Sequence, residues 1–254
     1  MTNFRLTIEY DGRRYSGWQR QGNTDNTIQG KIEQILSRMT GHAVEINGAG
    51  RTDAGVHAAG QVANAKFHTE LSDEELLQTI NHYLPEDIEV TSLTRMPERF
   101  HSRLNAVDKT YEYRIVLDGK KHVFERKYVY FPEAPLDVEK MKEASKAFIG
   151  THDFKSFCAN KRMKKSTVRT ITGIDFREKD GILTISYTGT GFLYHMVRIL
   201  TGTLVEVGMG KRDIASMAEI LEAENRECAG FLAPAAGLLL KEVRYVNPPK
   251  PVKR

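Results

Sequence analysis

The sequence predicts an α+β fold in which helices cover one face of a largely antiparallel sheet. Over the first hundred residues, stretches with the two-residue alternation of strands are interleaved with amphipathic helical stretches, in the order β, α, β, loop, β, α, β. In addition, FRLTIEYDG at residues 4–12 is echoed by YEYRIVLDG at 111–119, and both stretches alternate and end in Asp-Gly. This echo fits two similar α+β halves.

The first half begins with a strand over 4–10, which Asp11-Gly12 ends. A helix capped by Thr27 is expected to run to about residue 39, with a core-facing stripe made of Ile28, Ile32, Ile35, Leu36 and Met39. Strands over 43–47 and 60–67 flank a polar loop. Ser72 and Glu75 form a capping box for a second helix that Pro85 stops, and a strand follows over Ile88–Leu93.

The second half begins with the strand at 111–116, followed over 120–135 by a basic, aromatic connection with one short strand. Asp137 is expected to cap a helix that ends at Gly150, and ITGIDFR and ILTISYT predict a hairpin that turns at residues 179–181. The stretch 189–208 predicts a helix, Asp213 is expected to cap another, and 234–245 predicts a last strand. Residues 247–254 form a basic, proline-rich tail.

The composition is that of a soluble globular protein, with 254 residues, 40% hydrophobic and 28% charged. No apolar run approaches the roughly 20 residues that a membrane span needs, and the N-terminus enters a strand pattern rather than a signal peptide. The two cysteines, Cys158 and Cys228, suggest reduced thiols in a cytoplasmic protein, although one disulfide is also compatible with the count. A net charge of +4 is compatible with a nucleic-acid partner.

The most informative stretch is GAGRTDAGVHA at 48–58, a polar, glycine-rich loop between two strands. Arg51, Thr52 and Asp53 lie at its centre and His57 follows four residues after Asp53. An acid next to a guanidinium in such a loop suggests an ionised carboxylate held close to a ligand.

Three other interpretations of this loop compete. In a dinucleotide-binding turn the third glycine would fall at 53, where an acid would repel a pyrophosphate. The loop also fits a glycine-rich hairpin whose Asp caps its own backbone. A metal site from Asp53 and His57 would have two possible ligands without a second cluster.

The string G-R-T-D-A-G-V-H-A closely resembles the signature of the TruA family of tRNA pseudouridine synthases. Six further strings match that family: YDG…YxGWQRQ, F-H-S-R…K-T-Y-x-Y, THDFKSF at 151–157, TVRTI at 167–171, FxxHMVR and A-x-G-L-x-L. The resemblance covers nearly the whole chain, with Ser102 where many members have Ala and Leu239 where an aromatic is frequent. It implies two ferredoxin-like or RRM-like halves, 1–105 and 106–246, which share a mostly antiparallel sheet, carry helices on the outer face and enclose an active-site cleft.

The resemblance also implies roles for individual residues. Asp53 would be the catalytic nucleophile, Tyr111 and Leu238 would hold the target uracil between them, and Arg198 would meet Asp53. Arg51 would fill the space of the flipped base or hold its phosphate. Further substrate contacts are expected from Thr52, His57, Arg20, Arg169, Lys161, Arg162, Lys164 and Lys165, although the run KRMKK at 161–165 also fits a solvated loop.

Pseudouridine formation breaks a C–N glycosidic bond and rejoins the uracil through carbon, so no cofactor or metal is expected. The sequence leaves open whether Asp53 attacks the sugar, attacks the ring or first removes a sugar proton. The implied substrate is uridines 38, 39 and 40 of the tRNA anticodon stem-loop, flipped out of the stem, and the implied assembly is a homodimer. Two alternatives are a non-catalytic RNA-binding protein of two RRM-like halves and an Asp/His metal hydrolase.

Overall fold

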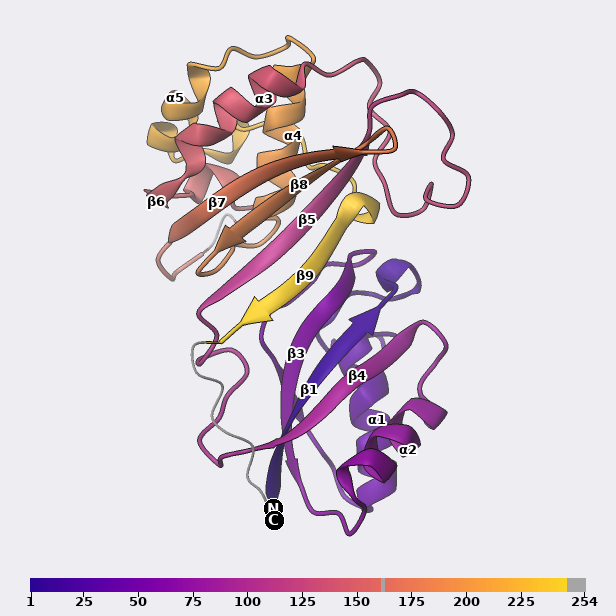
Figure 1. Cartoon of the computed structure of the whole chain (residues 1–254). Coiled ribbons are helices and arrows are strands. Elements are labelled where there is room, and N and C mark those ends of the chain that lie inside the picture. Colours follow the sequence, from indigo (N-terminus) through magenta and orange to yellow (C-terminus); the bar gives the residue numbers. More distant parts are fainter. Residues whose placement is uncertain (161–162, 246–254) are drawn as a thin grey trace. The chain divides into compact units, whose positions relative to one another are not determined.

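A computed structural model describes residues 1–160 and 163–245 (Figure 1). The described chain forms two compact units, one of Met1–Val107 with Leu239–Tyr245, and one of Asp108–Leu238. The expected boundary after residue 105 lies two residues before this division. The last strand, expected in the second half, belongs to the first unit, because Leu239 and Leu240 pair in parallel with His57 and Ala58.

The first unit is built on an antiparallel sheet around β1 (Thr2–Tyr10). On its two sides lie β3 (His57–Phe67) and β4 (Ile88–Met96), both antiparallel to β1. The short strand β2 (Ile46–Gly48) pairs with β3, and β9 (Leu238–Arg244) pairs with β3 in parallel. β3 begins at His57 rather than near residue 60, so His57 belongs to a strand and not to the loop before it.

Two helices, α1 (Ile28–Thr40) and α2 (Asp73–Tyr83), lie on one face of this sheet (Figure 1). Both start signals are confirmed: the Thr27 hydroxyl accepts from the Gly30 N–H, and Ser72 and Glu75 form a complete capping box. The stripe of α1 buries Ile28, Ile32 and Leu36 in the core, whereas Ile35 and Met39 are only half-buried.

The second unit has a sheet in the order β5-β8-β7-β6, antiparallel throughout. Its strands are β5 (Asp108–Val116), β6 (Gly150–Asp153), β7 (Val168–Lys179) and β8 (Ile182–Gly189). The expected hairpin is confirmed, since Asp180 and Gly181 both have positive φ (52° and 75°), as a tight two-residue turn requires. Instead of the short strand expected within 120–135, the structure has an isolated bridge between Ile115 and Tyr130.

The helices of the second unit are α3 (Val138–Ser145), α4 (Met196–Gly208) and α5 (Ser216–Ala223). Asp137 caps α3 as expected. The helix ends at Ser145, before the expected end at Gly150, and a 3₁₀ turn over Lys146–Phe148 follows it. The helix expected over 189–208 begins later, at Met196, because β8 extends to Gly189 and His195 adopts a left-handed conformation (φ 64°) before α4. The expected Asp213 cap is wrong: α5 starts after Ala215, and the Asp213 carbonyl accepts from the Ser216 N–H.

The α+β class with mostly antiparallel strands is therefore confirmed in both units. Within the described ranges, no helix is long and apolar enough to cross a membrane. Neither Cys158 nor Cys228 forms a disulfide there.

Candidate active site

The loop that carries Asp53 joins β2 to β3 in the first unit. Its first residues are held against β3: the Ala49 N–H donates to the Val62 carbonyl (2.7 Å), and the Gln61 side-chain amide donates to the Gly50 carbonyl (3.0 Å). These two contacts fix the path of the backbone up to Arg51.

Thr52 is fixed from two directions. Its hydroxyl lies 2.8 Å from the Tyr10 hydroxyl of β1, and its carbonyl accepts from the Trp18 N–H at 3.0 Å. The residue is 7% exposed, whereas Arg51 before it is exposed and Asp53 after it is half-buried. The side chain of Thr52 is therefore directed into the protein, between the exposed Arg51 and the half-buried Asp53.

A tight turn follows Asp53, closed by the Val56 N–H donating to the Asp53 carbonyl (3.2 Å), with Gly55 at φ 79°. The N-terminal segment packs directly on this turn. A Cβ at Gly12 would lie 1.9 Å from the Val56 carbonyl oxygen, and one at Gly17 would lie 2.7 Å from the Thr52 carbonyl oxygen. Only glycine allows this close approach of the two backbones.

His57 lies in the interior at the start of β3. Its Nδ1 is 3.2 Å from the Gly12 backbone nitrogen and 3.2 Å from an Asp11 carboxylate oxygen. His57 thereby connects the end of the Asp53 loop to the Asp11-Gly12 turn. Among the described residues, no group of three or more His, Cys, Asp or Glu side chains is close enough to hold a metal ion.

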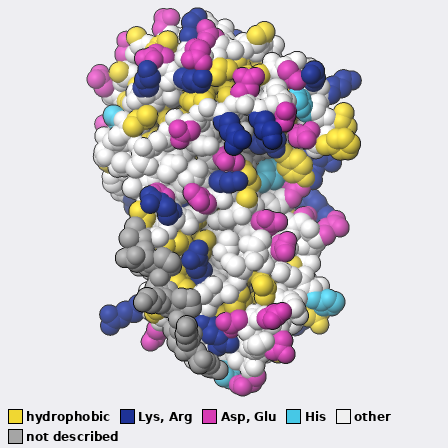
Figure 2. Space-filling view, in the orientation of Figure 1, with side chains coloured by type: hydrophobic (Ala, Val, Ile, Leu, Met, Phe, Trp, Pro, Cys, Tyr) yellow, Lys and Arg dark blue, Asp and Glu magenta, His cyan; other side chains and the backbone are white. Residues whose placement is uncertain are grey.

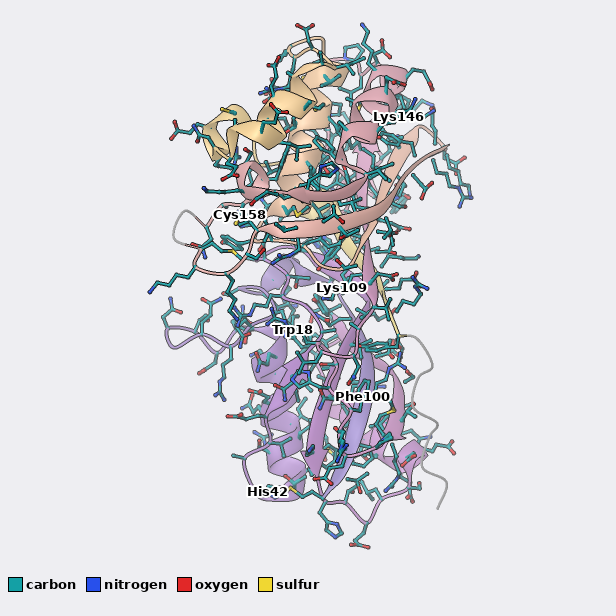
Figure 3. The ribbon with its side chains drawn as sticks, turned by 90° about the vertical axis from the view of Figure 1, so that its left-hand side faces the viewer. Trp18, His42, Phe100, Lys109, Lys146 and Cys158 are labelled. Carbon is teal, nitrogen blue, oxygen red and sulfur yellow. The ribbon has the colours of Figure 1, made fainter. Side chains whose placement is uncertain are left out.

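Trp18 is buried, as expected, and is 1% exposed (Figure 3). Its indole packs on Gly48 at the end of β2, where an added Cβ would lie 2.5 Å from Nε1. The ring therefore forms part of the support under the Asp53 loop.

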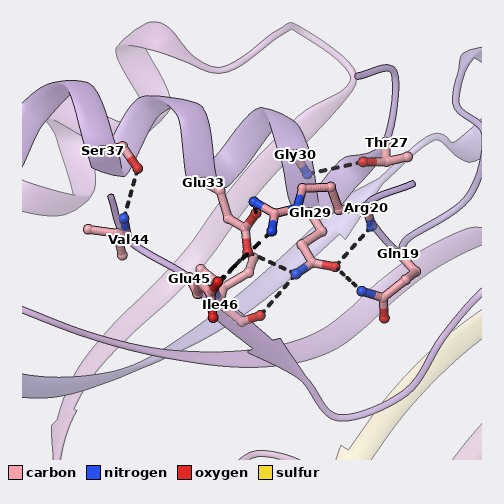
Figure 4. Close-up of polar contacts among 10 residues, drawn as sticks. All are labelled: Gln19, Arg20, Thr27, Gln29, Gly30, Glu33, Ser37, Val44, Glu45 and Ile46. Carbon is pink, nitrogen blue, oxygen red and sulfur yellow. Dashed lines mark hydrogen bonds and ion pairs between the residues drawn. The ribbon is translucent and has the colours of Figure 1, made fainter. Parts of the chain in front are cut away.

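Arg20 is exposed, as expected. Its guanidinium lies 3.3 Å from the carboxylate of the buried Glu33 in α1 and 3.9 Å from that of Glu45 (Figure 4). Glu33 also accepts from the Ile46 N–H (2.9 Å) and from the Gln29 amide (2.8 Å). This network connects the segment after Trp18 to α1 and to β2. A phosphate at Arg20 would therefore approach a cation that is already paired with carboxylates.

Tyr111 lies in β5 of the second unit and is 7% exposed. It stands opposite Tyr187 of β8, and its ring meets that of Phe192 edge to face at a centroid distance of 5.1 Å. These contacts hold the Tyr111 ring in one orientation.

Arg198 lies in the first turn of α4 and makes a reciprocal contact with Ala233. Its Nε donates to the Ala233 carbonyl (2.7 Å), and the Ala233 N–H donates to the Arg198 carbonyl (3.2 Å). The Tyr113 hydroxyl donates to the next carbonyl, that of Pro234, at 2.7 Å. Burial raises the pKa of Tyr113, so this hydroxyl stays protonated as a donor.

The segment fixed in this way leads directly to Leu238. Gly237 packs so closely on β5 that an added Cβ would lie 2.7 Å from the Tyr113 ring and 3.0 Å from the Arg114 carbonyl. Arg198, Tyr111 and Leu238 are thus positioned by elements of one unit, whereas Arg51, Thr52, Asp53, His57 and Arg20 belong to the other.

The other basic residues that the sequence predicts as substrate contacts and that the structure describes lie in the second unit. Arg169, in β7, donates to the carbonyls of Ser166 (2.9 Å) and Val168 (2.6 Å). Lys164 and Lys165 are exposed. Lys161, Arg162 and the tail 247–254 lie outside the described residues.

A family model described as "tRNA pseudouridine synthase" matches residues 6–105 and 144–246. The chain belongs to the tRNA pseudouridine synthase family. A protein of Bacillus sp. (strain KSM-64) named "tRNA pseudouridine synthase A" is 49% identical over 245 residues, which are 96% of this chain and 100% of that protein. The protein of Bacillus cereus (strain ZK / E33L) named "tRNA pseudouridine synthase A 2" is 45% identical with the same coverage.

A third relative, "tRNA pseudouridine synthase A 2" of Clostridium tetani (strain Massachusetts / E88), is 44% identical over 96% of this chain and 98% of its own length. The solved structure of a Cbf5-Nop10-Gar1 complex aligns with 80% of this chain and 45% of that chain, at 14% identity and a TM-score of 0.36. The family resemblance seen in the motifs is confirmed by the family model and the relatives.

Sequence reasoning missed several residues that position the site. The sequence marks Tyr10 and Asp11 only as the end of a strand and the start of a turn, although they support Thr52 and His57. Ala233 precedes the last motif and carries no chemical signal of its own. Its role lies in backbone groups that meet Arg198, which only the folded chain reveals.

Proposed function

We propose that this protein converts uridines 38, 39 and 40 in the anticodon stem-loop of tRNA to pseudouridine. The support is family membership together with relatives, named tRNA pseudouridine synthase A, that are 45–49% identical over their whole length. The observation that carries the proposal is the Asp53 loop, in which Thr52 is fixed inward so that an acid is presented beside a guanidinium.

Asp53 acts as the nucleophile in this proposal. As the bond between C1′ and N1 of the uridine breaks, a carboxylate captures or stabilises the positive charge at C1′. The released uracil turns and forms a bond from C5 to C1′, C5 loses a proton, and N1 ends with one. Substrate and product are isomers, so the reaction consumes no oxidant, reductant or cofactor.

Tyr111 and Leu238 hold the uracil between them, and Arg198 pairs with Asp53 and fixes its carboxylate. These roles are supported by contacts that hold each residue in place. The Tyr111 ring packs on Phe192, Arg198 donates to the Ala233 carbonyl, and Tyr113 donates to the segment before Leu238. Tyr111 or Asp53 itself serves as the base for the C5 proton.

The flipped uridine needs a group to occupy its place or to hold its phosphate, and Arg51 is exposed and next to Thr52 and Asp53. The outer phosphates meet a set of basic contacts made of Arg20, Arg169, Lys161, Arg162, Lys164 and Lys165. Thr52 and His57 are buried and serve the substrate from within, by supporting the Asp53 loop. The enzyme acts in the cytoplasm as a homodimer.

The test is the pseudouridine content of an unmodified tRNA transcript after incubation with the wild type and with Asp53→Asn, without added metal or cofactor. The wild type is expected to convert uridines 38–40, and Asp53→Asn is expected to bind tRNA with an unchanged Kd and to convert none. Asp25→Asn removes an exposed acid from the same unit and serves as the matched control, which is expected to keep full activity.

If the wild type and Asp53→Asn both bind tRNA and neither converts it, the protein is an RNA-binding module without this activity. If Asp53→Asn retains conversion, the nucleophile is another residue. Activity that disappears when a chelator is added would instead support a metal-dependent hydrolase.

A further inference from the structure

The chain between β5 and α3 forms a loop over residues 117–129 whose two ends are fastened together. The Val116 N–H donates to the Tyr130 carbonyl and the Tyr130 N–H donates to the Arg114 carbonyl, both at 2.9 Å. Val129 is buried in a cluster with Val116 and Ile182. The loop therefore starts and ends on the sheet and extends from it as one closed unit (Figure 1).

The inside of this loop is also organised. Asp118 accepts from the His122 ring (2.8 Å) and from the Lys120 N–H (3.0 Å), and His122 adopts φ 39°, which is uncommon for a residue other than glycine. Toward the tip, the Arg126 guanidinium donates to the Val123 carbonyl. These contacts fix a short turn that holds Val123 and Phe124 away from the body of the unit.

Phe124 is 89% exposed, which makes it the most exposed aromatic side chain among the described residues, and Val123 beside it is 56% exposed. A single exposed apolar residue is ordinary on a protein surface. Here the exposed ring stands at the tip of a loop that is fastened at its base and braced within. Val129, in the same loop, is buried against Val116 and Ile182 of the sheet. The Phe124 ring is instead left in solvent.

Exposed cations lie on both sides of Phe124 in the sequence of the loop. Lys120, Lys121, Arg126 and Lys127 are all exposed, against two acids in the loop, Asp118 and Glu125. Asp118 is engaged at the base with His122 and Lys120. In the space-filling view, hydrophobic side chains stand out at this loop with Lys and Arg side chains near them (Figure 2).

We propose that loop 117–129 binds RNA, with Phe124 stacking on an unpaired base and Lys121 and Lys127 contacting the neighbouring phosphates. A ring flanked by cations suits single-stranded nucleic acid, because the ring takes a base face and the cations take the backbone. The apolar surface of two side chains is far smaller than the roughly 800 Å² that each partner of a stable protein interface buries. The identification of this RNA as the tRNA substrate rests on the proposed function, and the loop adds a contact away from the target uridine.

The ring is tested by tRNA binding to the full chain with Phe124→Ala and Phe124→Trp. Loss of base stacking is expected to weaken the Kd for an unmodified tRNA by about tenfold in Phe124→Ala, and the indole of Phe124→Trp is expected to restore it. Tyr83→Ala, which removes another exposed aromatic from α2, is the matched control and is expected to leave the Kd unchanged.

Phe124→Trp also reports the contact directly. Trp18 is buried, so iodide quenches mainly the introduced indole. Bound tRNA is expected to protect that indole from iodide.

The cations are tested through the salt dependence of binding. Removing two phosphate contacts with Lys121→Ala and Lys127→Ala is expected to lower the slope of log K against log salt by about 1.4, at the value of about 0.7 per contact for single strands. Lys140→Ala with Lys146→Ala removes two exposed lysines, one in α3 and one in the 3₁₀ turn that follows it, and is expected to keep the slope.

A Kd for Phe124→Ala within twofold of the wild type overturns the proposal. So does a change in sedimentation with unchanged tRNA affinity, which would make the loop a contact between copies of this chain. If tRNA binding depends on Phe124 and the wild type forms no pseudouridine, the proposed function fails and the RNA-binding loop stands. If the wild type forms pseudouridine and Phe124→Ala has the wild-type Kd and KM, the loop inference alone fails.

Discussion

The hydroxyl of Tyr10 lies 2.8 Å from the hydroxyl of Thr52, in a buried contact between the central strand β1 and the loop that carries Asp53. Burial raises the pKa of Tyr10, so the hydroxyl remains protonated across the neutral range. Tyr10 therefore holds Thr52 inward at every working pH. Through Thr52 it holds the backbone from which the Asp53 side chain extends.

This contact predicts a positioning role for Tyr10. Tyr10→Phe is expected to lower kcat by about fivefold, because a hydrogen bond worth about 1 kcal/mol no longer fixes the loop, and to leave KM for tRNA nearly unchanged. The measurement is steady-state pseudouridine formation over a range of tRNA concentrations.

Tyr245→Phe is the control for this prediction. It removes another buried tyrosine hydroxyl in the same unit, which donates to the Ser102 carbonyl at 2.6 Å. Both variants are expected to lose about 1 kcal/mol of unfolding free energy, but only Tyr10→Phe is expected to lower kcat. Equal kcat losses in the two variants would show a general stability effect instead of positioning.

The close approach at Gly12 predicts a strong effect of a single methyl group. Gly12→Ala places its Cβ 1.9 Å from the Val56 carbonyl oxygen, so backbone must move on one side of the contact. An unfolding free energy lower by about 3 kcal/mol is expected from urea denaturation. Gly22→Ala, where a Cβ meets nothing within 4 Å, is expected to change it by less than about 0.5 kcal/mol. Similar values for the two variants would contradict the packing argument.

Local signals in the sequence predicted the elements that depend on neighbouring residues. The Thr27 cap, the Ser72 and Glu75 capping box and the Asp180-Gly181 turn each involve groups within a few residues of one another. The motif at 48–58 likewise gave the candidate loop, because its glycines and its acid are contiguous.

Long-range contacts account for what the sequence did not reveal. β9 joins the first unit by pairing with β3, and the paired residues His57 and Leu239 are about 180 positions apart in the sequence. The support of Thr52 by Tyr10, and of Arg198 by Ala233, brings together residues 42 and 35 positions apart. Neither periodicity nor a motif encodes which distant backbone group a side chain meets.

The capping box of α2 predicts a pH dependence of stability. The Ser72 hydroxyl and backbone N–H both donate to Glu75 and lower the pKa of its carboxyl below the ordinary value of 4.5. A lowered folded-state pKa stabilises the protein above the unfolded-state value, and that contribution is lost as the pH falls through the folded-state pKa. Glu75→Gln is therefore expected to be less stable than the wild type at pH 7 and to approach it as the pH falls below the ordinary carboxyl pKa of 4.5. Thermal unfolding of both proteins from pH 3 to pH 7 measures this, and a difference that is constant with pH would contradict it.

The reciprocal contact between Arg198 and Ala233 predicts that lysine cannot replace this arginine. Arg198→Lys keeps the positive charge but loses the Nε–H that donates to the Ala233 carbonyl, so the segment leading to Leu238 loses one of its fixed points. A decrease in kcat/KM of about tenfold is expected, with a tRNA Kd close to the wild-type value, because the lost hydrogen bond orders the site rather than holding the RNA. Arg212→Lys, which changes an arginine paired with Glu206 in the same unit, is the control and is expected to retain activity. If Arg198→Lys retains wild-type kcat/KM, charge alone accounts for the role of Arg198, and the anchoring at Ala233 contributes only to folding.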